Sequence, residues 1–372
     1  MNDGSADDAP RVLVLGAGAS GKAAAALSAA RGRAVESAEG YSLVVASPGI
    51  RVMSELEYGC RELRRRGVRM LAVTGSKGKS SVVKLVASAL GLANLRAVPC
   101  GNYGTPVSEV ALREPPPDWA VVEVSSFMLE TTNLPPGTFE AAAVLNLQED
   151  HLDRHGSLAL YHALKLKLLA SAKVGFAPGD ARLDVRDVPR GSYFDNDVLR
   201  ANGAFAAALC RAAGLDRETV ARAFGAFEPL PHRFQLVAER GGVRFVDDSK
   251  ATSVAALVAG VAMAGSGVRL IAGGLAKGDD AKVARDHLTK RVKKVYLIGR
   301  CAEEFRSAWA GAADCEVCGT LERAVESATR DAAKGETVLL SPGTASYDQF
   351  RNYGERGDVF ASLVNKEGKQ RQ

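Results

Sequence analysis

The sequence lacks long apolar runs, a cysteine framework and a leader of the secretory type. No segment approaches the ~18 consecutive apolar residues that a transmembrane helix needs, so we expect no membrane span. The six cysteines are scattered, which is typical of a protein from a reducing cytoplasm. Residues 1–10 are acidic and polar, and they do not have the basic-then-apolar layout of a signal peptide.

A dense basic stripe with interleaved aromatics is also absent. The formal net charge of +5 is small for 372 residues, so it favours an anionic small-molecule substrate and gives no reason to expect nucleic acid. Cys315 and Cys318 have the spacing of a metal or redox pair, but no second pair accompanies them, and we interpret the spacing as incidental. A chain of this length exceeds one typical core, which predicts two or three domains.

The most informative feature that is present is a glycine-rich turn between an apolar run and a helical pattern. The apolar run covers residues 70–73, the turn at residues 75–80 reads Gly-Ser-Lys-Gly-Lys-Ser, and the helical pattern covers residues 82–90. This order predicts a phosphate-binding loop, in which backbone N–H groups surround phosphate oxygens at the positive end of a helix. We expect Lys79 to reach the outer phosphates of a nucleotide and Ser80 to offer its hydroxyl to Mg²⁺.

A second glycine-rich turn lies near the N-terminus. Residues 11–15 have a strand pattern, residues 16–21 read Gly-Ala-Gly-Ala-Ser-Gly, and residues 22–30 form an alanine-rich helical pattern. Such a unit can bind any nucleotide diphosphate at its helix N-terminus. A nicotinamide oxidoreductase is one alternative, but it does not explain the phosphate loop. In addition, no acid closes the next predicted strand, at residues 43–46, at the usual spacing of ~20 residues.

Strands and helices alternate along the rest of the chain. We predict strands at residues 119–124, 141–146, 243–246, 268–272, 294–298 and 337–340, and helices at 157–172 and 199–213. This alternation predicts α/β domains with mostly parallel sheets, whose ligands lie at the carboxyl ends of the strands. We therefore expect a Rossmann-like N-terminal domain at 1–53, a central phosphate-loop ATPase domain at 54–229 and a C-terminal Rossmann-like domain at 230–372, joined by a hinge at 230–235.

Several polar side chains in the central region carry the chemistry. Glu123 lies in an apolar strand, where an acid is costly without a partner, so we favour a Mg²⁺ ligand over a satisfied polar residue. The acid-rich segment at residues 146–153 fits a metal loop and a mixed-charge surface loop equally well, and His151 is an unusual ligand for Mg²⁺. Lys165 and Lys167 face different helix directions, so one can point inward or both can be surface lysines.

Three loops of the last third each follow a predicted strand. Residues 247–253, 273–278 and 341–350 carry hydroxyls, acids or a lysine, and together they suggest an anion site at one edge of a sheet.

Taken together, these motifs resemble the muramyl ligase family, whose members join an amino acid to a UDP-muramyl precursor with ATP. The phosphate loop is similar to the family's T-G-[ST]-x-G-K-[ST] pattern, and residues 123–127 and 146–153 are similar to its metal-binding segments. Residues 231–234 resemble its hinge, and the likeness runs in order over nearly the whole chain. Within the family, residues 248–252 and 341–350 resemble the members that add D-glutamate.

The resemblance implies that D-glutamate is added to UDP-N-acetylmuramoyl-L-alanine in peptidoglycan precursor biosynthesis, through an acyl phosphate, by a cytoplasmic monomer. It implies ATP and two Mg²⁺ ions, one held by Ser80 and Glu123 and the other by His151 and a carbamylated Lys165. The implied catalytic residues are Lys79, Lys165, His151 and Lys277. The implied ATP contacts are Gly75, Ser76, Lys77, Gly78, Lys79, Ser80, Ser81, Asn202, Arg233, Asp248 and Lys250. The implied contacts with the other substrates are Gly18, Ala19, Ser20, Ser47, Asn102, Ser125, Thr252, Lys277, Ser346, Tyr347 and Tyr353.

Two alternatives stay beside this interpretation. One is another ligase of the same kind, or one similar to folylpolyglutamate synthase; the motif at residues 248–252 argues against it. The other is a nucleotide-binding protein that has lost ligase activity, since segments usual in the family are missing between residues 31 and 43 and between residue 49 and the phosphate loop. Arg33 and Ser47 are the candidate substrate contacts that this shortened region retains.

Overall fold

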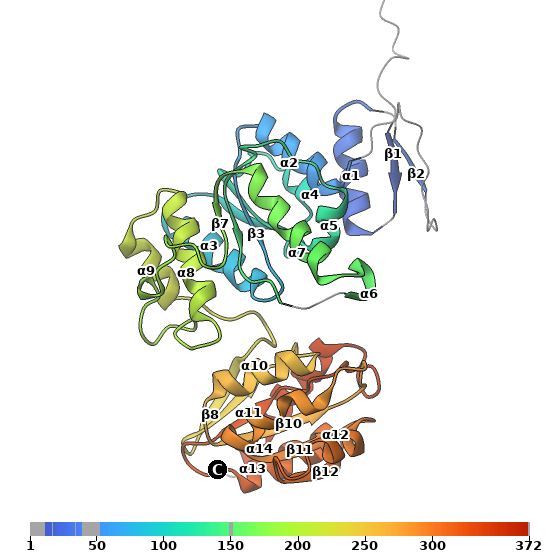
Figure 1. The fold of residues 1–372 in the computed structure, drawn as a ribbon, viewed down its shortest axis with the longest axis vertical. Coiled ribbons are helices and arrows are strands. Elements are labelled where there is room, and N and C mark those ends of the chain that lie inside the picture. The colour runs from blue at the N-terminus through green and yellow to red at the C-terminus, as the bar shows by residue number, and fades with distance from the viewer. Residues whose placement is uncertain (1–11, 17, 34, 39–52, 149–151, 371–372) are drawn as a thin grey trace, which may run out of the picture. The chain divides into compact units, whose positions relative to one another are not determined.

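The computed structural model describes residues 12–16, 18–33, 35–38, 53–148 and 152–370 (Figure 1). The chain divides into two compact units, one of residues 1–195 and 199–227, the other of residues 196–198 and 228–372. In the described residues, no helix is long and apolar enough to cross a membrane.

The first unit is built on a five-stranded parallel sheet with the strand order β4-β5-β3-β6-β7. Its strands are β3 (Arg69–Thr74), β4 (Ala97–Gly101), β5 (Trp119–Glu123), β6 (Phe139–Val144) and β7 (Ala172–Phe176). β3 lies in the middle, and all of its residues after Arg69 are buried. A parallel strand covered on both faces reads as a continuous apolar run, which explains why the sequence predicted β3.

Helices cover both faces of this sheet. The helices of the unit after α1 are α2 (Glu55–Arg65), α3 (Lys79–Leu92), α4 (Val107–Val110), α5 (Ser126–Thr131), α6 (Leu152–His155), α7 (Leu158–Lys167), α8 (Arg200–Ala212) and α9 (Arg217–Gly225). α3 packs with α8 and α9, whereas α2 packs with α4 (Figure 1). The helix predicted over residues 157–172 is shorter than expected, because a 3₁₀ turn (Leu168–Ser171) follows α7 and β7 begins at Ala172.

The N-terminal part contributes a small βαβ unit. β1 (Val12–Leu15) pairs in parallel with β2 (Val35–Ala38), and α1 (Ala19–Ala30) connects them. The tyrosine hydroxyl of Tyr58 on α2 accepts hydrogen bonds from Ser28 Oγ at 3.2 Å and from Arg33 Nη1 at 3.1 Å. Sequence reasoning did not anticipate β2, and the strand that it expected at 43–46 lies outside the described residues.

The second unit has a six-stranded sheet with the order β12-β11-β10-β13-β9-β8. β8 (Gln235–Arg240) is antiparallel to β9 (Val243–Asp247), and the other neighbours are parallel. The remaining strands are β10 (Val268–Gly273), β11 (Val292–Ile298), β12 (Cys315–Gly319) and β13 (Thr337–Leu340). The carboxyl ends of β9, β10 and β13 therefore share one edge of the sheet.

Alternate residues of these strands enter two cores, one on each face. Leu270 packs on one face with α10 (Val254–Ala264), α11 (Arg285–Arg291) and α12 (Ala302–Ala308). Ile271 packs on the other face with α13 (Leu321–Asp331) and α14 (Tyr353–Gln370). Helices on both faces of a mostly parallel sheet confirm the predicted α/β class.

Candidate functional site

The phosphate loop connects β3 to α3 at the carboxyl end of the central strand. Gly75 and Gly78 have φ values of +147° and +84°, which L side chains rarely adopt. Gly78 is the N-cap of α3, and a Cβ at this position would collide with the side-chain amide of Asn202 on α8. The predicted nucleotide contact Asn202 thus lies directly against the loop, at the positive end of a helix of 14 residues.

Two ammonium groups meet at the carbonyl oxygen of Gly75. Lys79 Nζ donates to it at 2.9 Å from the first turn of α3, and Lys165 Nζ donates to it at 3.0 Å from α7. The Lys165 side chain is buried, whereas Lys167 Nζ donates to the carbonyl of Thr132 at 2.6 Å. Of the two lysines that the sequence left open, Lys165 is the one that points to the phosphate loop.

The loop after β6 is closed against the phosphate loop by a set of short hydrogen bonds. Ser76 Oγ donates to the carbonyl of Gln148 at 2.8 Å and accepts from the hydroxyl of Tyr161 at 3.1 Å. The side-chain amide of Asn146 accepts from the N–H of Lys77 at 2.8 Å and donates to its carbonyl at 2.9 Å. Sequence reasoning placed Asn146 in an acid-rich metal loop and missed its role as the amide that shapes the phosphate loop.

Glu123 ends β5 beside the strand that leads into the phosphate loop, in register with Val73. Its side chain is buried, and Oε1 accepts from Nδ2 of Asn102 at 2.8 Å. Oε2 is buried without a hydrogen-bond partner among the described residues. A buried carboxylate oxygen without a partner is costly, and a hard cation that prefers oxygen satisfies it. A carboxylate oxygen from Glu123 and a hydroxyl oxygen from Ser80, at the start of α3, are a donor set that fits Mg²⁺.

His151, the predicted ligand of the second metal ion, lies outside the described residues. In the part of the chain that the structure describes, no group of three or more His, Cys, Asp or Glu side chains is placed to hold a metal ion. Ser125, a predicted substrate contact, caps α5 by accepting from the N–H of Met128 at 3.2 Å.

A buried histidine that the sequence gave no reason to select lies nearby. His155 on α6 contacts Ser126 Oγ through Nε2 at 2.9 Å and Glu130 through Nδ1 at 3.2 Å. It also stacks on the ring of Phe127, with centroids 5.4 Å apart. These contacts tie α6, which follows the acid-rich loop, to α5, which follows Glu123.

In the second unit, the segment between residues 230 and 234 folds back onto the end of β9. His232 and Phe234 have φ values of +59° and +49°, unusual for residues with side chains. His232 is held through Nδ1 to Asp247 Oδ2 at 2.7 Å, and the N–H of Phe234 donates to Asp248 Oδ1 at 3.1 Å. The adjacent Arg233 is in the same turn, its N–H donating to the carbonyl of Leu230 at 3.1 Å.

Asp248 and Lys250 are held in different ways. Asp248 Oδ2 accepts from Ser341 Oγ at 2.9 Å, and burial raises the pKa of the Asp248 carboxyl from 3.8 to about 7 against these hydrogen bonds. Lys250 Nζ lies 3.8 Å from the ring centroid of Tyr353. The structure therefore brings together Asp248, Lys250 and Tyr353, three of the predicted site residues, at the carboxyl end of β9.

Two of the loops that carry predicted D-glutamate contacts pair with each other. Leu275 and Ala345 exchange two backbone hydrogen bonds, of 2.9 and 3.1 Å, which join the loop that carries Lys277 to the loop that carries Ser346. Ser346 is buried, Thr252 is partly buried, Lys277 is exposed, and Tyr347 is 71% exposed. In the first unit, Gly18, Ala19 and Ser20 form the exposed N-terminus of α1, and Ser47 lies outside the described residues.

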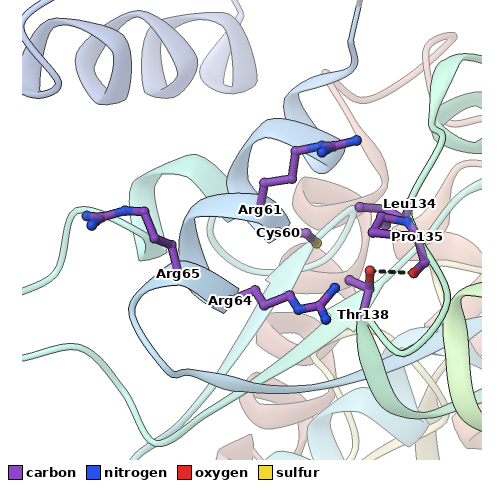
Figure 2. A pocket seen from close by; sticks show the side chains of 7 residues that line it. All are labelled: Cys60, Arg61, Arg64, Arg65, Leu134, Pro135 and Thr138. Atoms are coloured by element: carbon purple, nitrogen blue, oxygen red, sulfur yellow. Dashed lines mark hydrogen bonds between the residues drawn. The ribbon is translucent and has the colours of Figure 1, made fainter.

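A cavity of about 440 Å³ lies elsewhere on the first unit (Figure 2). Its lining contains none of the predicted site residues and consists of Cys60, Arg61, Arg64, Arg65, Leu134, Pro135 and Thr138. Arg61 and Arg65 are paired with the buried acids Glu57 and Glu62 at 2.8 and 3.0 Å. These two arginines therefore already have carboxylate partners within α2.

Two family models match parts of the chain, one in each compact unit. Residues 73–181 match the Mur ligase middle domain, and residues 232–343 match the Mur ligase, glutamate ligase domain. The chain is 38% identical to the UDP-N-acetylmuramoylalanine–D-glutamate ligase of Nitratidesulfovibrio vulgaris, over 86% of this chain and 77% of that protein. It is 31% identical to the ligase of the same name from Chlamydia caviae, over 95% of this chain and 97% of that protein.

Solved structures show the same fold at lower identity. The MurF ligase of Thermotoga maritima in complex with ADP aligns with a TM-score of 0.62 and 14% identity, over 99% of this chain and 97% of that one. The UDP-N-acetylmuramate-alanine ligase MurC of the same organism aligns with a TM-score of 0.60 and 14% identity, over 96% of this chain and 99% of that one.

Proposed function

The chain belongs to the family of UDP-N-acetylmuramoylalanine–D-glutamate ligases, and from this premise we propose that it joins D-glutamate to UDP-N-acetylmuramoyl-L-alanine with ATP. The reaction is a step of peptidoglycan precursor biosynthesis. The observation that carries the chemistry is the glycine-rich N-terminus of α3, where Lys79 Nζ lies 2.9 Å from the carbonyl oxygen of Gly75. Such a site concentrates positive charge where the phosphates of a nucleotide bind.

We propose that residues 75–81 surround the ATP phosphates and that Lys79 leaves the Gly75 carbonyl to contact the γ-phosphate. Asn202 lies against Gly78 and would position the adenosine side of the nucleotide. Mg²⁺, when bound, neutralises charge on the phosphates that would otherwise repel the attacking carboxylate. Ser80 and Glu123 would hold one ion, because Oε2 of Glu123 needs a partner.

The chemistry follows from the charges of the site. A carboxylate oxygen of the lactyl-alanine group attacks the γ-phosphorus of ATP, the bond to ADP breaks, and an acyl phosphate forms. The amine of D-glutamate then attacks the acyl carbon, loses a proton, and expels phosphate through a tetrahedral intermediate. Lys79 offsets the negative charge that develops on the transferred group.

We propose further that Lys165 acts as a carbamate. Its neutral amine would add to CO₂ and lose a proton, which converts a buried cation into an anion beside the phosphate loop. With His151 this carbamate would form a second Mg²⁺ position. The support for this step is the buried position of the Lys165 amine at the loop, 3.0 Å from the Gly75 oxygen.

The remaining substrate contacts belong to the N-terminal and C-terminal parts of the chain. We propose that Gly18, Ala19, Ser20, Ser47, Asn102 and Ser125 contact the UDP-muramyl substrate, and that Arg233, Asp248 and Lys250 contact ATP. Thr252, Lys277, Ser346, Tyr347 and Tyr353 would surround D-glutamate, with Lys277 pairing with a carboxylate. The division into domains at 1–53, 54–229 and 230–372, the monomeric state and the cytoplasmic location are parts of the same proposal.

Phosphate release from ATP tests the activity. It is measured with UDP-N-acetylmuramoyl-L-alanine and a panel of amino acids that includes both enantiomers of glutamate. The proposal expects release that requires both the UDP-sugar and D-glutamate. Release with another amino acid would favour a different ligase of the family, and nucleotide binding without any release would favour a protein that has lost catalysis.

A further inference from the structure

A buried arginine that none of the motifs includes lies at the centre of the C-terminal site. Arg356 is in the first turn of α14, and its side chain is fully buried. No carboxylate of the described residues lies within ion-pair distance of it. Arginines are almost never fully buried without an ion-pair partner, so neither solubility nor a salt bridge explains why Arg356 is buried here.

The guanidinium donates to the turns that follow two different strands. Nε donates to Ser249 Oγ and Nη2 to the Ser249 carbonyl, both at 2.9 Å, in the turn after β9. Nη2 also donates to the Thr344 carbonyl at 3.2 Å, and Nη1 to the Ala345 carbonyl at 3.4 Å, in the turn after β13. The Ala345 backbone in turn pairs with Leu275, in the loop that carries Lys277.

The charge of Arg356 is retained at neutral pH. Burial lowers the pKa of its guanidinium to about 10, and the nearby carboxylates of Asp348 and Asp247 oppose that fall. The cation is therefore held by carbonyl dipoles and by charges beyond direct contact. A planar fork with five N–H groups can reach acceptors in both turns at once, whereas a lysine presents its donors from one point.

We propose that Arg356 is a positioning residue that fixes the turn of Asp248–Lys250 against the turn of Thr344–Ser346. The first turn carries the proposed ATP contacts Asp248 and Lys250, and the second carries the proposed D-glutamate contact Ser346. One side chain therefore holds parts of both proposed binding sites in place. This inference rests on the proposed function for its kinetic consequence, but its structural consequence can be measured without any activity.

The test compares Arg356→Lys with a matched control, Arg269→Lys. Arg269 is also largely buried in the second unit, where it pairs with Glu336 at 2.7 Å at the opposite edge of the same sheet. Both variants lose a guanidinium and destabilise the unit. In Arg356→Lys we expect KM for ATP and KM for D-glutamate each to rise about tenfold, which is the low end of the effect of losing one hydrogen bond from a charged donor. KM for the UDP-muramyl substrate stays as in the wild type, and the control changes none of the three.

Amide hydrogen exchange without substrates gives a readout that does not depend on catalysis. In Arg356→Lys, exchange should accelerate at residues 248–252 and 342–348 together, and the control should leave both segments as in the wild type. Added guanidinium should restore part of the activity of Arg356→Ala and none of that of Arg269→Ala. Unchanged exchange in both segments, or equal rises of all three KM values, would overturn the proposal. If the wild type itself releases no phosphate, the proposed function is wrong, and the hydrogen-exchange result still decides whether Arg356 positions the two turns.

Discussion

The substitution Glu123→Gln tests two effects of Glu123 separately: the loss of stability from burying its charge, and the gain of stability when its carboxylate binds Mg²⁺. Oε1 of Glu123 keeps a partner after the change, since the amide oxygen can still accept from Asn102. The charge on Oε2, which has no partner among the described residues, disappears. An unsatisfied buried polar group costs about 1–3 kcal/mol, and more when it is charged. Without Mg²⁺ the variant should therefore be as stable as the wild type or more stable.

With added Mg²⁺, the wild type should become more stable than Glu123→Gln. A ligand at 100 times its Kd stabilises the folded state by about 2.7 kcal/mol, which is a rise in Tm of about 5 °C or more for a domain of this size. The assay is thermal unfolding with a non-hydrolysable ATP analogue, with and without Mg²⁺. The wild type should gain this increment, and Glu123→Gln should not.

Glu57→Gln is the matched control, because Glu57 is also buried but has partners on both oxygens. Arg61 donates to its Oε1 at 2.8 Å, and the N–H of Asn133 donates to its Oε2 at 2.8 Å. This control should lower Tm equally with and without Mg²⁺. The reasoning is refuted if Glu123→Gln loses stability without Mg²⁺ as the control does, or if it gains as much from Mg²⁺ as the wild type.

Three further substitutions test other parts of the site. Lys165→Ala should remove most activity, with partial recovery in acetate or another small carboxylate; wild-type rates in the phosphate assay would exclude the carbamate. Lys277→Ala should raise KM for D-glutamate far more than KM for ATP, and equal rises would count against the carboxylate contact. Asp248→Asn should abolish most activity yet stabilise the fold in a pH-dependent way. Because the pKa of Asp248 is raised from 3.8 to about 7, the folded state holds a proton that the unfolded state has released. The free energy of unfolding of the wild type therefore falls as pH rises from about 4 to about 7. The fall is about 1.4 kcal/mol per pH unit and about 4 kcal/mol at most. In urea unfolding, the free energy of unfolding of Asp248→Asn minus that of the wild type should increase between pH about 4 and about 7. A difference that does not change with pH would contradict the explanation by a buried acid.

The sequence predicted those parts of the fold whose signal is local. β3, β5 and β13 are buried on both faces, so each appears in the sequence as a continuous apolar run. The turn at residues 75–80 combines glycine, lysine and serine in an order that is typical of phosphate-binding loops. Strands with weaker signals escaped notice. β4 contains Pro99 at the edge of its sheet, and β12 is an edge strand that is only half-buried.

The candidate site was predictable where chemistry follows from residue type in a motif. The packing partners were not, because their roles depend on contacts between distant segments. Arg356 contacts Ser249 across 107 residues of chain, and His155 contacts Ser126 across 29. Nothing in the residues beside Arg356 or His155 indicates these partners, since a buried polar side chain is defined by what the fold places around it.

The transfer of oxygen from the UDP-muramyl carboxylate to phosphate tests the central claim most directly. The substrate is prepared with both carboxylate oxygens as ¹⁸O and incubated with ATP, Mg²⁺ and D-glutamate, and the products are analysed by mass spectrometry. If the carboxylate is activated as an acyl phosphate, one labelled oxygen appears in the released phosphate and the other stays in the new amide. Phosphate without label, or ATP consumption without a labelled amide of D-glutamate, would contradict the account.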